Sequence, residues 1–446
     1  MRDSQIAFQP SWGRRIVGME GLRALAAIGV LIGHTRVHMS DFVSWGVATP
    51  LMYLLLNGLT LFFALSGFLL FRPFASALLT GDKLPAIGRY ATNRALRIFP
   101  AYIVITLLVS LVLGTAYFTP QLNSLESSGE LVGYMTDPGL LLINMTMLQT
   151  LFPFSLKTGI GVAWSLTVEL VFYVVMPLLA IVAWKIRKRS TDHRGLLIAA
   201  APIAAMFLIG IVGKIVKWSI FQGFTEDERF LYEWGGNWFA VFARSFPAHA
   251  DLFAFGMLAA LLVAAFETER IPHAYAARFR TGAFLTAVAM VGATYFAPGD
   301  FKDTTLAVAF GAAIFFIALP ARTGGPGIVA KSLDFLPLRY VGLVSYSLYL
   351  WHLPVIWLVV KFGWQGPETY PGFLWNVGLV FAISLTFASA TYYLIEKPAL
   401  ALKKRTDKRK QPKPVQPEAE VSPASEAQAG DVVGSDAAAP TTAGPA

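Results

Sequence analysis

Long apolar runs, separated by short polar and basic stretches, repeat along almost the whole chain. Ten of these runs are long enough to cross a bilayer as α-helices, which takes roughly 17 to 25 residues each. They cover residues 19–38, 50–72, 98–118, 163–185, 195–217, 249–266, 279–297, 304–320, 340–361 and 372–396. The pattern therefore predicts an all-α, polytopic membrane bundle of about ten transmembrane helices.

Composition agrees with a membrane protein. Of the 446 residues, 55% are hydrophobic and only 14% are charged, whereas a soluble protein has about 25% charged residues. Cysteine is absent, which excludes thiolate nucleophiles, disulfides and cysteine-bound metal. The first 18 residues are polar and aromatic, so no cleavable signal peptide is expected.

The formal net charge of +9 is distributed unevenly along the chain. If the N-terminus starts inside, most of the 36 Lys and Arg residues lie in cytoplasmic segments or at the inner ends of spans. This asymmetry follows the positive-inside rule and predicts that both termini are cytoplasmic, with loops 119–162 and 218–248 outside. The basic residues thus indicate a lipid bilayer as the partner, and no nucleic acid.

Three parts of the chain differ in composition. Residues 1–18 form a cytoplasmic N-terminal segment, and residues 19–398 form the transmembrane domain. Residues 399–446 are first basic and then rich in Pro, Ala, Glu, Ser and Gly. We expect this last part to be a disordered cytoplasmic tail whose basic portion rests near anionic lipid headgroups.

Both long outer loops contain apolar or aromatic pieces. Loop 119–162 includes Leu140 to Phe154, which is too short to span comfortably and is expected to be an interfacial helix. Loop 218–248 contains Trp234 and Trp238 around a Gly-Gly-Asn sequence. These tryptophans indicate either a polar mouth that binds an acceptor or an interfacial aromatic belt.

The first apolar run carries two side chains that a lipid-facing helix would avoid, Arg23 and His34. Eleven residues make about three helical turns, so both project from one face, roughly 16 Å apart. An ionisable group inside a span usually marks a site. We expect Arg23 to hold a charged ligand and His34 to accept a proton.

Simpler roles compete with these. Arg23 can be a snorkelling anchor at the interface, and His34 can be a hydrogen-bonded residue of helix packing. His38, one turn beyond His34, gives a spacing that suits zinc. No nearby acid or third histidine is evident in the sequence, so no metal site is expected.

Arg94 and Arg97 lie at the inner end of the third run. Their i, i+3 spacing puts both guanidinium groups on one helix face, and Arg suits phosphate because its planar fork donates two hydrogen bonds. Ordinary positive-inside anchoring is the alternative. Because Arg23 is expected at the same membrane face, the three arginines together can clamp a polyanionic ligand.

Two further spans carry polar stripes. In the fourth, Ser165, Glu169 and Tyr173 recur at i, i+4 and i+8. Glu169 is expected either to orient His34 by accepting its other ring proton or to bind a hydroxylated acceptor; a neutral carboxyl bonded to a neighbouring helix is the alternative. In the ninth span, Tyr349 and His352 share a face with Ser345, forming a substrate contact or a structural hydrogen-bond seam.

In this order, the motifs resemble those of the acyltransferase-3 family of membrane acyltransferases, over residues 18–398. The motifs that carry the resemblance are Gly21-Leu22-Arg23 with His34, Phe62 to Phe68, Arg94 with Arg97, Trp164-Ser165-Leu166 with Glu169, Ser345 to His352, and Ile395-Glu396-Lys397-Pro398.

The resemblance implies an O-acyltransferase of the cell membrane. Such a protein moves an acetyl or other short acyl group from cytoplasmic acyl-CoA to a hydroxyl of an envelope glycan or glycolipid. It also implies that Arg23, His34, Arg94 and Arg97 are the functional positions. We expect the three arginines to hold the CoA phosphates and His34 to be catalytic, and the polar stripe of the fourth span adds Glu169 as a second catalytic residue. Ser165, Tyr349 and His352 are the expected substrate contacts, and acyl-CoA is a co-substrate rather than a permanently bound cofactor.

Two alternatives stay open from the residues themselves. A transporter or flippase for a polar lipid or glycan would also place charged residues inside its spans. A non-catalytic membrane scaffold explains the hydropathy but gives no reason for Arg23, His34 and Glu169 to occupy spans. Within the enzyme reading, the acyl group passes directly to the acceptor or first to His34.

Overall fold

The computed structural model describes residues 15–44, 46, 49–118, 132–190, 194–320 and 325–402. Most of the N-terminal segment and nearly all of the expected disordered tail therefore lie outside the described residues. The described part is almost entirely helical, with one two-stranded antiparallel hairpin of β1 (Ala116–Tyr117) and β2 (Val132–Gly133). The prediction of an all-α membrane bundle is confirmed.

Each of the ten apolar runs contains a long helix. These helices are α1 (Met19–Met39), α3 (Gly58–Thr80), α4 (Ile87–Leu107), α6 (Trp164–Arg187), α7 (Gly195–Ile220), α10 (Ala250–Glu267), α11 (Ala276–Ala293), α12 (Phe301–Ala318), α15 (Ser345–Lys361) and α16 (Tyr370–Thr391). The shorter helices are α2 (Thr49–Leu56), α5 (Pro138–Met145), α8 (Glu226–Trp234), α9 (Trp238–Ala243), α13 (Ile328–Leu333) and α14 (Leu336–Leu343). Two π-helical turns, Leu108–Leu113 and Tyr392–Glu396, extend α4 and α16.

Among the described residues, 7 helices are long and apolar enough to cross a membrane. An eighth span is formed if α14 and α15, which meet at an angle of 75°, count as one. Helices α1 and α11 lie where spans were expected but are less apolar: Arg23 and Arg36 interrupt α1, and Arg278 and Arg280 begin α11. The chain is thus a multi-pass membrane protein in which α1 and α11 are less apolar than the helices counted as spans.

Two of the expected runs are not single helices. The run 50–72 divides at Asn57, whose side-chain amide donates to the Tyr53 carbonyl, and the second helix then continues to Thr80. The run 340–361 divides at Val344. Neither break lies at a proline, so the hydropathy pattern alone gave no sign of them.

The expected interfacial helix in the first outer loop is shorter than predicted. Helix α5 ends at Met145 and covers only the first half of Leu140–Phe154. The rest consists of a short 3-10 segment and turns, from which Phe152 and Phe154 project and stack on each other.

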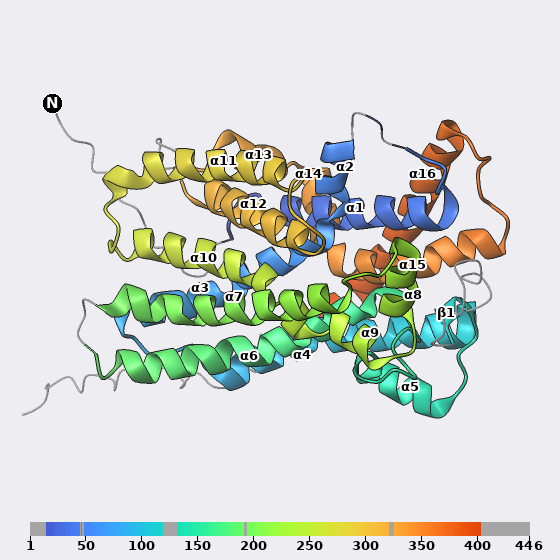
Figure 1. Cartoon of the computed structure of the whole chain (residues 1–446), viewed down its shortest axis with the longest axis horizontal. Coiled ribbons are helices and arrows are strands. Elements are labelled where there is room, and N and C mark those ends of the chain that lie inside the picture. Colours follow the sequence, from blue (N-terminus) through green and yellow to red (C-terminus); the bar gives the residue numbers. More distant parts are fainter. Residues whose placement is uncertain are drawn as a thin grey trace, which may run out of the picture. The chain divides into compact units, whose positions relative to one another are not determined.

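Helices α3 and α10 form the tightly packed centre of the bundle. Nearly all residues of α10 are buried, and α12 and α7 pack against its two sides (Figure 1). A Cβ atom on Gly256 would lie 1.8 Å from the carbonyl oxygen of Ala64, and one on Gly67 would lie 2.2 Å from that of Phe253. Such close backbone contact at small residues is typical of helix packing in membranes.

This contact gives a stability prediction. Because Gly256→Ala has no room, we expect α3 and α10 to separate, at a cost of about 1–3 kcal/mol. Gly282→Ala in α11 is the matched control, since its Cβ meets nothing within 4 Å. In detergent, Gly256→Ala should lower the Tm while Gly282→Ala does not; equal Tm values would contradict the packing.

Topology is tested by cysteine labelling, for which the cysteine-free chain is suited. The charge distribution places Thr225 outside and Ser190 inside. A cysteine at Thr225 should therefore react with a membrane-impermeant thiol reagent in intact cells, and one at Ser190 only after lysis. Labelling of the Ser190 variant alone in intact cells would invert the predicted orientation.

Candidate functional site

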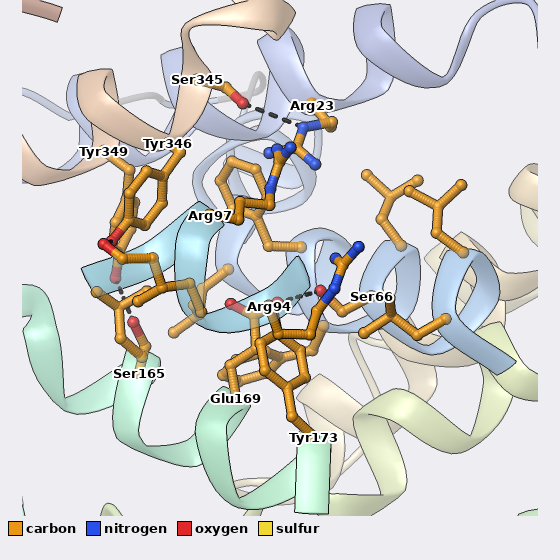
Figure 2. A pocket seen from close by; sticks show the side chains of 18 residues that line it. Arg23, Ser66, Arg94, Arg97, Ser165, Glu169, Tyr173, Ser345, Tyr346 and Tyr349 are labelled. Atoms are coloured by element: carbon orange, nitrogen blue, oxygen red, sulfur yellow. Dashed lines mark hydrogen bonds between the residues drawn. The ribbon is translucent and has the colours of Figure 1, made fainter. Parts of the chain in front are cut away.

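Three arginines line one pocket inside the bundle, as the sequence predicted. Arg23 comes from α1, and Arg94 and Arg97 come from α4. Figure 2 shows Arg23 and Arg97 extending toward each other across the pocket, with Arg94 on another side. The remaining polar residues of the lining are Ser66, Ser165, Glu169, Tyr173, Ser345, Tyr346 and Tyr349.

Close contact between α1 and α14 positions Arg23. A Cβ atom on Gly342 of α14 would lie 1.8 Å from the Glu20 carbonyl oxygen, and one on Gly21 would lie 2.1 Å from that of Leu333 at the end of α13. Because α1 lies directly on α14, Arg23 reaches the break between α14 and α15, where its Nε donates to Ser345 Oγ at 3.2 Å. Arg23 is therefore directed into the pocket rather than along the helix toward an interface.

The break at Val344 also exposes a helix end to the pocket. Ser345 and Tyr346, the first residues of α15, are part of the lining. The Tyr346 hydroxyl donates to the Ile98 carbonyl at 2.8 Å and so holds this end of α15 next to Arg97. The first N–H groups of a helix carry partial positive charge, which adds to that of the arginines.

Glu169 is the one acidic residue among the residues that line this pocket. Its carboxylate accepts a hydrogen bond from the Ser66 hydroxyl, across from α3. The guanidinium of Arg94 lies 6.0 Å from the centre of the Tyr173 ring, which comes from the same face of α6 as Glu169. Three guanidinium groups against one carboxylate leave an excess of positive charge that suits a polyanion.

A second carboxylate, Glu396, lies behind the lining. It is buried in the π-helical turn at the end of α16, accepts a hydrogen bond from Ser347, and interacts electrostatically with Arg97 and Arg23. Sequence reasoning quoted it only within a motif and assigned it no role. The sequence feature that could have pointed to Glu396 is an acidic residue at the end of an apolar run.

Ser165 and Tyr349 meet within the pocket. Ser165 Oγ and the Tyr349 hydroxyl oxygen are 2.7 Å apart, and both groups also contact the Val162 carbonyl. The polar stripe of α6 and the polar face of α15 thus contribute to the same cavity, although the two hydroxyls are partly occupied by each other.

His34 does not line the arginine pocket. Its Nδ1 lies 3.0 Å from Nε2 of His352, and the two ring centres are 5.0 Å apart. The expectation that Glu169 orients His34 is wrong, because the carboxylate pairs with Ser66 on α3 instead. His352, expected to contact substrate, likewise lies outside this pocket and is the partner of His34.

The two sites adjoin through one residue. Tyr349 lines the arginine pocket with its ring and hydroxyl, and its ring centre is 5.5 Å from that of His352. Its backbone carbonyl accepts from His352 Nδ1 at 2.5 Å. The pocket and the histidine pair are therefore neighbours in α15.

The third histidine of this region is His38, whose ring stacks on His34 with centres 6.1 Å apart. The sequence alone showed no third histidine near His34 and His38, because His352 lies far away along the chain. Even so, the described residues contain no group of three His, Cys, Asp or Glu side chains that could hold a metal ion.

Trp234, one candidate for an acceptor-binding mouth, is covered by cations. The Arg244 guanidinium lies 3.5 Å from its ring centre, and Lys157 Nζ lies 4.6 Å from it. Burial, with Arg244 as a smaller contribution, lowers the pKa of Lys157 to about 7. Trp234 is thus not free to stack on a sugar, whereas Trp238 is 67% exposed.

Comparison with known proteins gives a consistent result. The model of a family described as an acyltransferase domain matches residues 16–393. A putative peptidoglycan O-acetyltransferase YrhL of Bacillus subtilis is 24% identical, over 86% of this chain and 55% of its own length. Peptidoglycan O-acetyltransferase OatA of Listeria monocytogenes is 23% identical, over 86% of this chain and 55% of its own.

O-acetyltransferase OatA of Staphylococcus aureus is 22% identical, over 86% of this chain and 57% of its own length. The chain thus spans little more than half the length of these curated relatives. No solved structure matches.

Proposed function

Because the chain belongs to the acyltransferase domain family, we propose that it is a membrane O-acyltransferase whose donor is cytoplasmic acyl-CoA. The acyl group is acetyl or another short chain, and the acceptor is a hydroxyl of a cell-envelope glycan or glycolipid. Since the matched relatives are named as peptidoglycan O-acetyltransferases, a peptidoglycan hydroxyl is the first acceptor to test.

The observation that carries the donor assignment is the approach of like charges in the pocket. Arg23 and Arg97 extend toward each other and interact electrostatically, with Arg94 lining the same cavity (Figure 2). Guanidinium groups facing each other away from bulk water repel, and an anion between them relieves that repulsion. The phosphates of CoA, which planar guanidinium groups bind in pairs of hydrogen bonds, are a suitable polyanion.

His34 is the proposed general base. It takes the proton of the acceptor hydroxyl, and the oxygen attacks the carbonyl carbon of the thioester. The tetrahedral intermediate collapses with cleavage of the carbon–sulfur bond, and the departing CoA sulfur takes the proton back from His34. The eleven residues from Arg23 to His34 amount to roughly 16 Å along α1, which separates the phosphate site from the reacting atoms.

The proposal is tested with purified protein, acetyl-CoA labelled in the acetyl group, and peptidoglycan fragments. We expect label in the glycan together with release of free CoA thiol. A transporter would leave the thioester intact, so unchanged acetyl-CoA with demonstrably folded protein would refute the proposal. Mass spectrometry of glycans and lipids from a deletion strain should show a missing acetyl mass on the natural acceptor.

A further inference from the structure

His34 is held from across the bundle by a single side chain. His352, in α15, is only 1% exposed, and its Nε2 lies 3.0 Å from His34 Nδ1. No described residue forms a hydrogen bond to the other ring nitrogen of His34, Nε2. The contact therefore distinguishes the two nitrogens of the imidazole that the proposed function uses as its base.

The direction of the hydrogen bond between His34 and His352 follows from the second hydrogen bond that His352 makes. His352 Nδ1 lies 2.5 Å from the Tyr349 carbonyl oxygen, and a carbonyl can only accept. His352 Nδ1 must therefore carry a proton. A neutral imidazole has one N–H group, so Nε2 of His352 has a lone pair and accepts.

A doubly protonated His352 would be a buried imidazolium, and none of its hydrogen-bond partners in the described part of the chain is a carboxylate. Burying such a charge unpaired is costly. The neutral form is thus the one that fits, and His34 Nδ1 must be the donor in the contact between the rings.

We propose that His352 is a positioning residue that fixes His34 as the Nδ1–H tautomer, so that Nε2 is the atom which accepts the acceptor's proton. The inference rests on the proposed function for the role of His34, but the tautomer itself is a property of the protein without substrate. His352 does not touch the reacting atoms. It acts by keeping one lone pair of His34 available and aimed away from α15.

The test is nitrogen NMR of protein labelled with ¹⁵N in its six histidines. The His34 signals are assigned by their loss in His34→Gln. We expect a protonated Nδ1 and an unprotonated Nε2 in the native protein. A native spectrum with the proton on Nε2 overturns the inference, whatever the activity.

Two variants of His352 separate positioning from packing. His352→Gln keeps an amide oxygen that can accept from His34 Nδ1, whereas His352→Leu keeps bulk but has no acceptor. We expect Gln to retain the native tautomer and most of the activity. Leu should give a mixture of tautomers and lower kcat by about 10- to 100-fold, with an unchanged KM for acyl-CoA.

Equal activity and equal spectra in the Gln and Leu variants would refute the positioning role even if both fold. Should Leu fail to fold, the native spectrum and the Gln variant still decide. The proposed function fails separately: transfer that persists in His34→Gln removes the general base, while the assigned tautomer of the native protein stands.

Discussion

Replacing His34 with Gln or Ala should leave a folded protein that binds acyl-CoA with near-native affinity but transfers the acyl group at least about 10²- to 10⁴-fold more slowly. That range is the usual contribution of proton transfer by a positioned side chain. Binding should survive because the three arginines line a pocket of which His34 is not part. Single-turnover transfer and equilibrium binding, measured on the same preparation, check the two halves separately.

Gln is the informative replacement. Its amide keeps one hydrogen bond toward His352 but accepts no proton at neutral pH, so a purely structural histidine would be rescued by Gln. His273→Gln, at a histidine outside both the pocket and the histidine pair, is the control and should transfer normally. Substantial transfer by His34→Gln would leave His34 only a packing role.

The double variant Arg94→Ala/Arg97→Ala should lose most of its affinity for acyl-CoA. Hydrogen bonds to charged groups are worth about 1.5–3 kcal/mol each, so removal of two guanidinium groups should weaken binding by at least about 100-fold. Arg97→Lys keeps the charge but loses the paired hydrogen bonds, and should raise KM with a smaller change in kcat. Calorimetry with free CoA measures the affinity without turnover.

Arg89→Ala is the matched control, because Arg89 lies on the same helix but outside the lining of the pocket. It removes one positive charge near α4 without removing a pocket contact, so affinity should stay within a few-fold of native. If the double variant also binds CoA normally, Arg94 and Arg97 serve as topological anchors and the donor binds elsewhere.

Sequence reasoning located the helices and the arginines for the same physical reason. A bilayer forces the backbone into helices of a minimum length, so apolar runs reveal the bundle. Within such a run, a guanidinium is costly enough to mark a cavity, and the i, i+3 spacing of Arg94 and Arg97 already fixes a shared face. These features depend on positions within one helix.

The pairing of side chains between helices could not be read in the same way. The sequence predicted Glu169 as the partner of His34, whereas the structure pairs His34 with His352. The rotation of each helix about its axis is set by packing against its neighbours and not by its own sequence. Here Gly21 brings α1 against the end of α13 and Gly342 brings it against α14, and the break at Val344 then sets the direction of α15. The hydropathy of residues 340–361 is continuous across that break, so the sequence concealed it.

Arg23 and His34 belong to one uninterrupted helix of 21 residues. In the proposed reaction, α1 therefore acts as a ruler: the separation between phosphate site and base is set by helical rise, about 1.5 Å per residue, rather than by a movable loop. A donor is therefore selected by the length of the chain between its phosphates and its thioester as well as by its charge. Acetyl phosphate has the anion but lacks this chain, and N-acetylcysteamine thioesters have the thioester but lack the anion. Neither compound reaches from the phosphate site to His34.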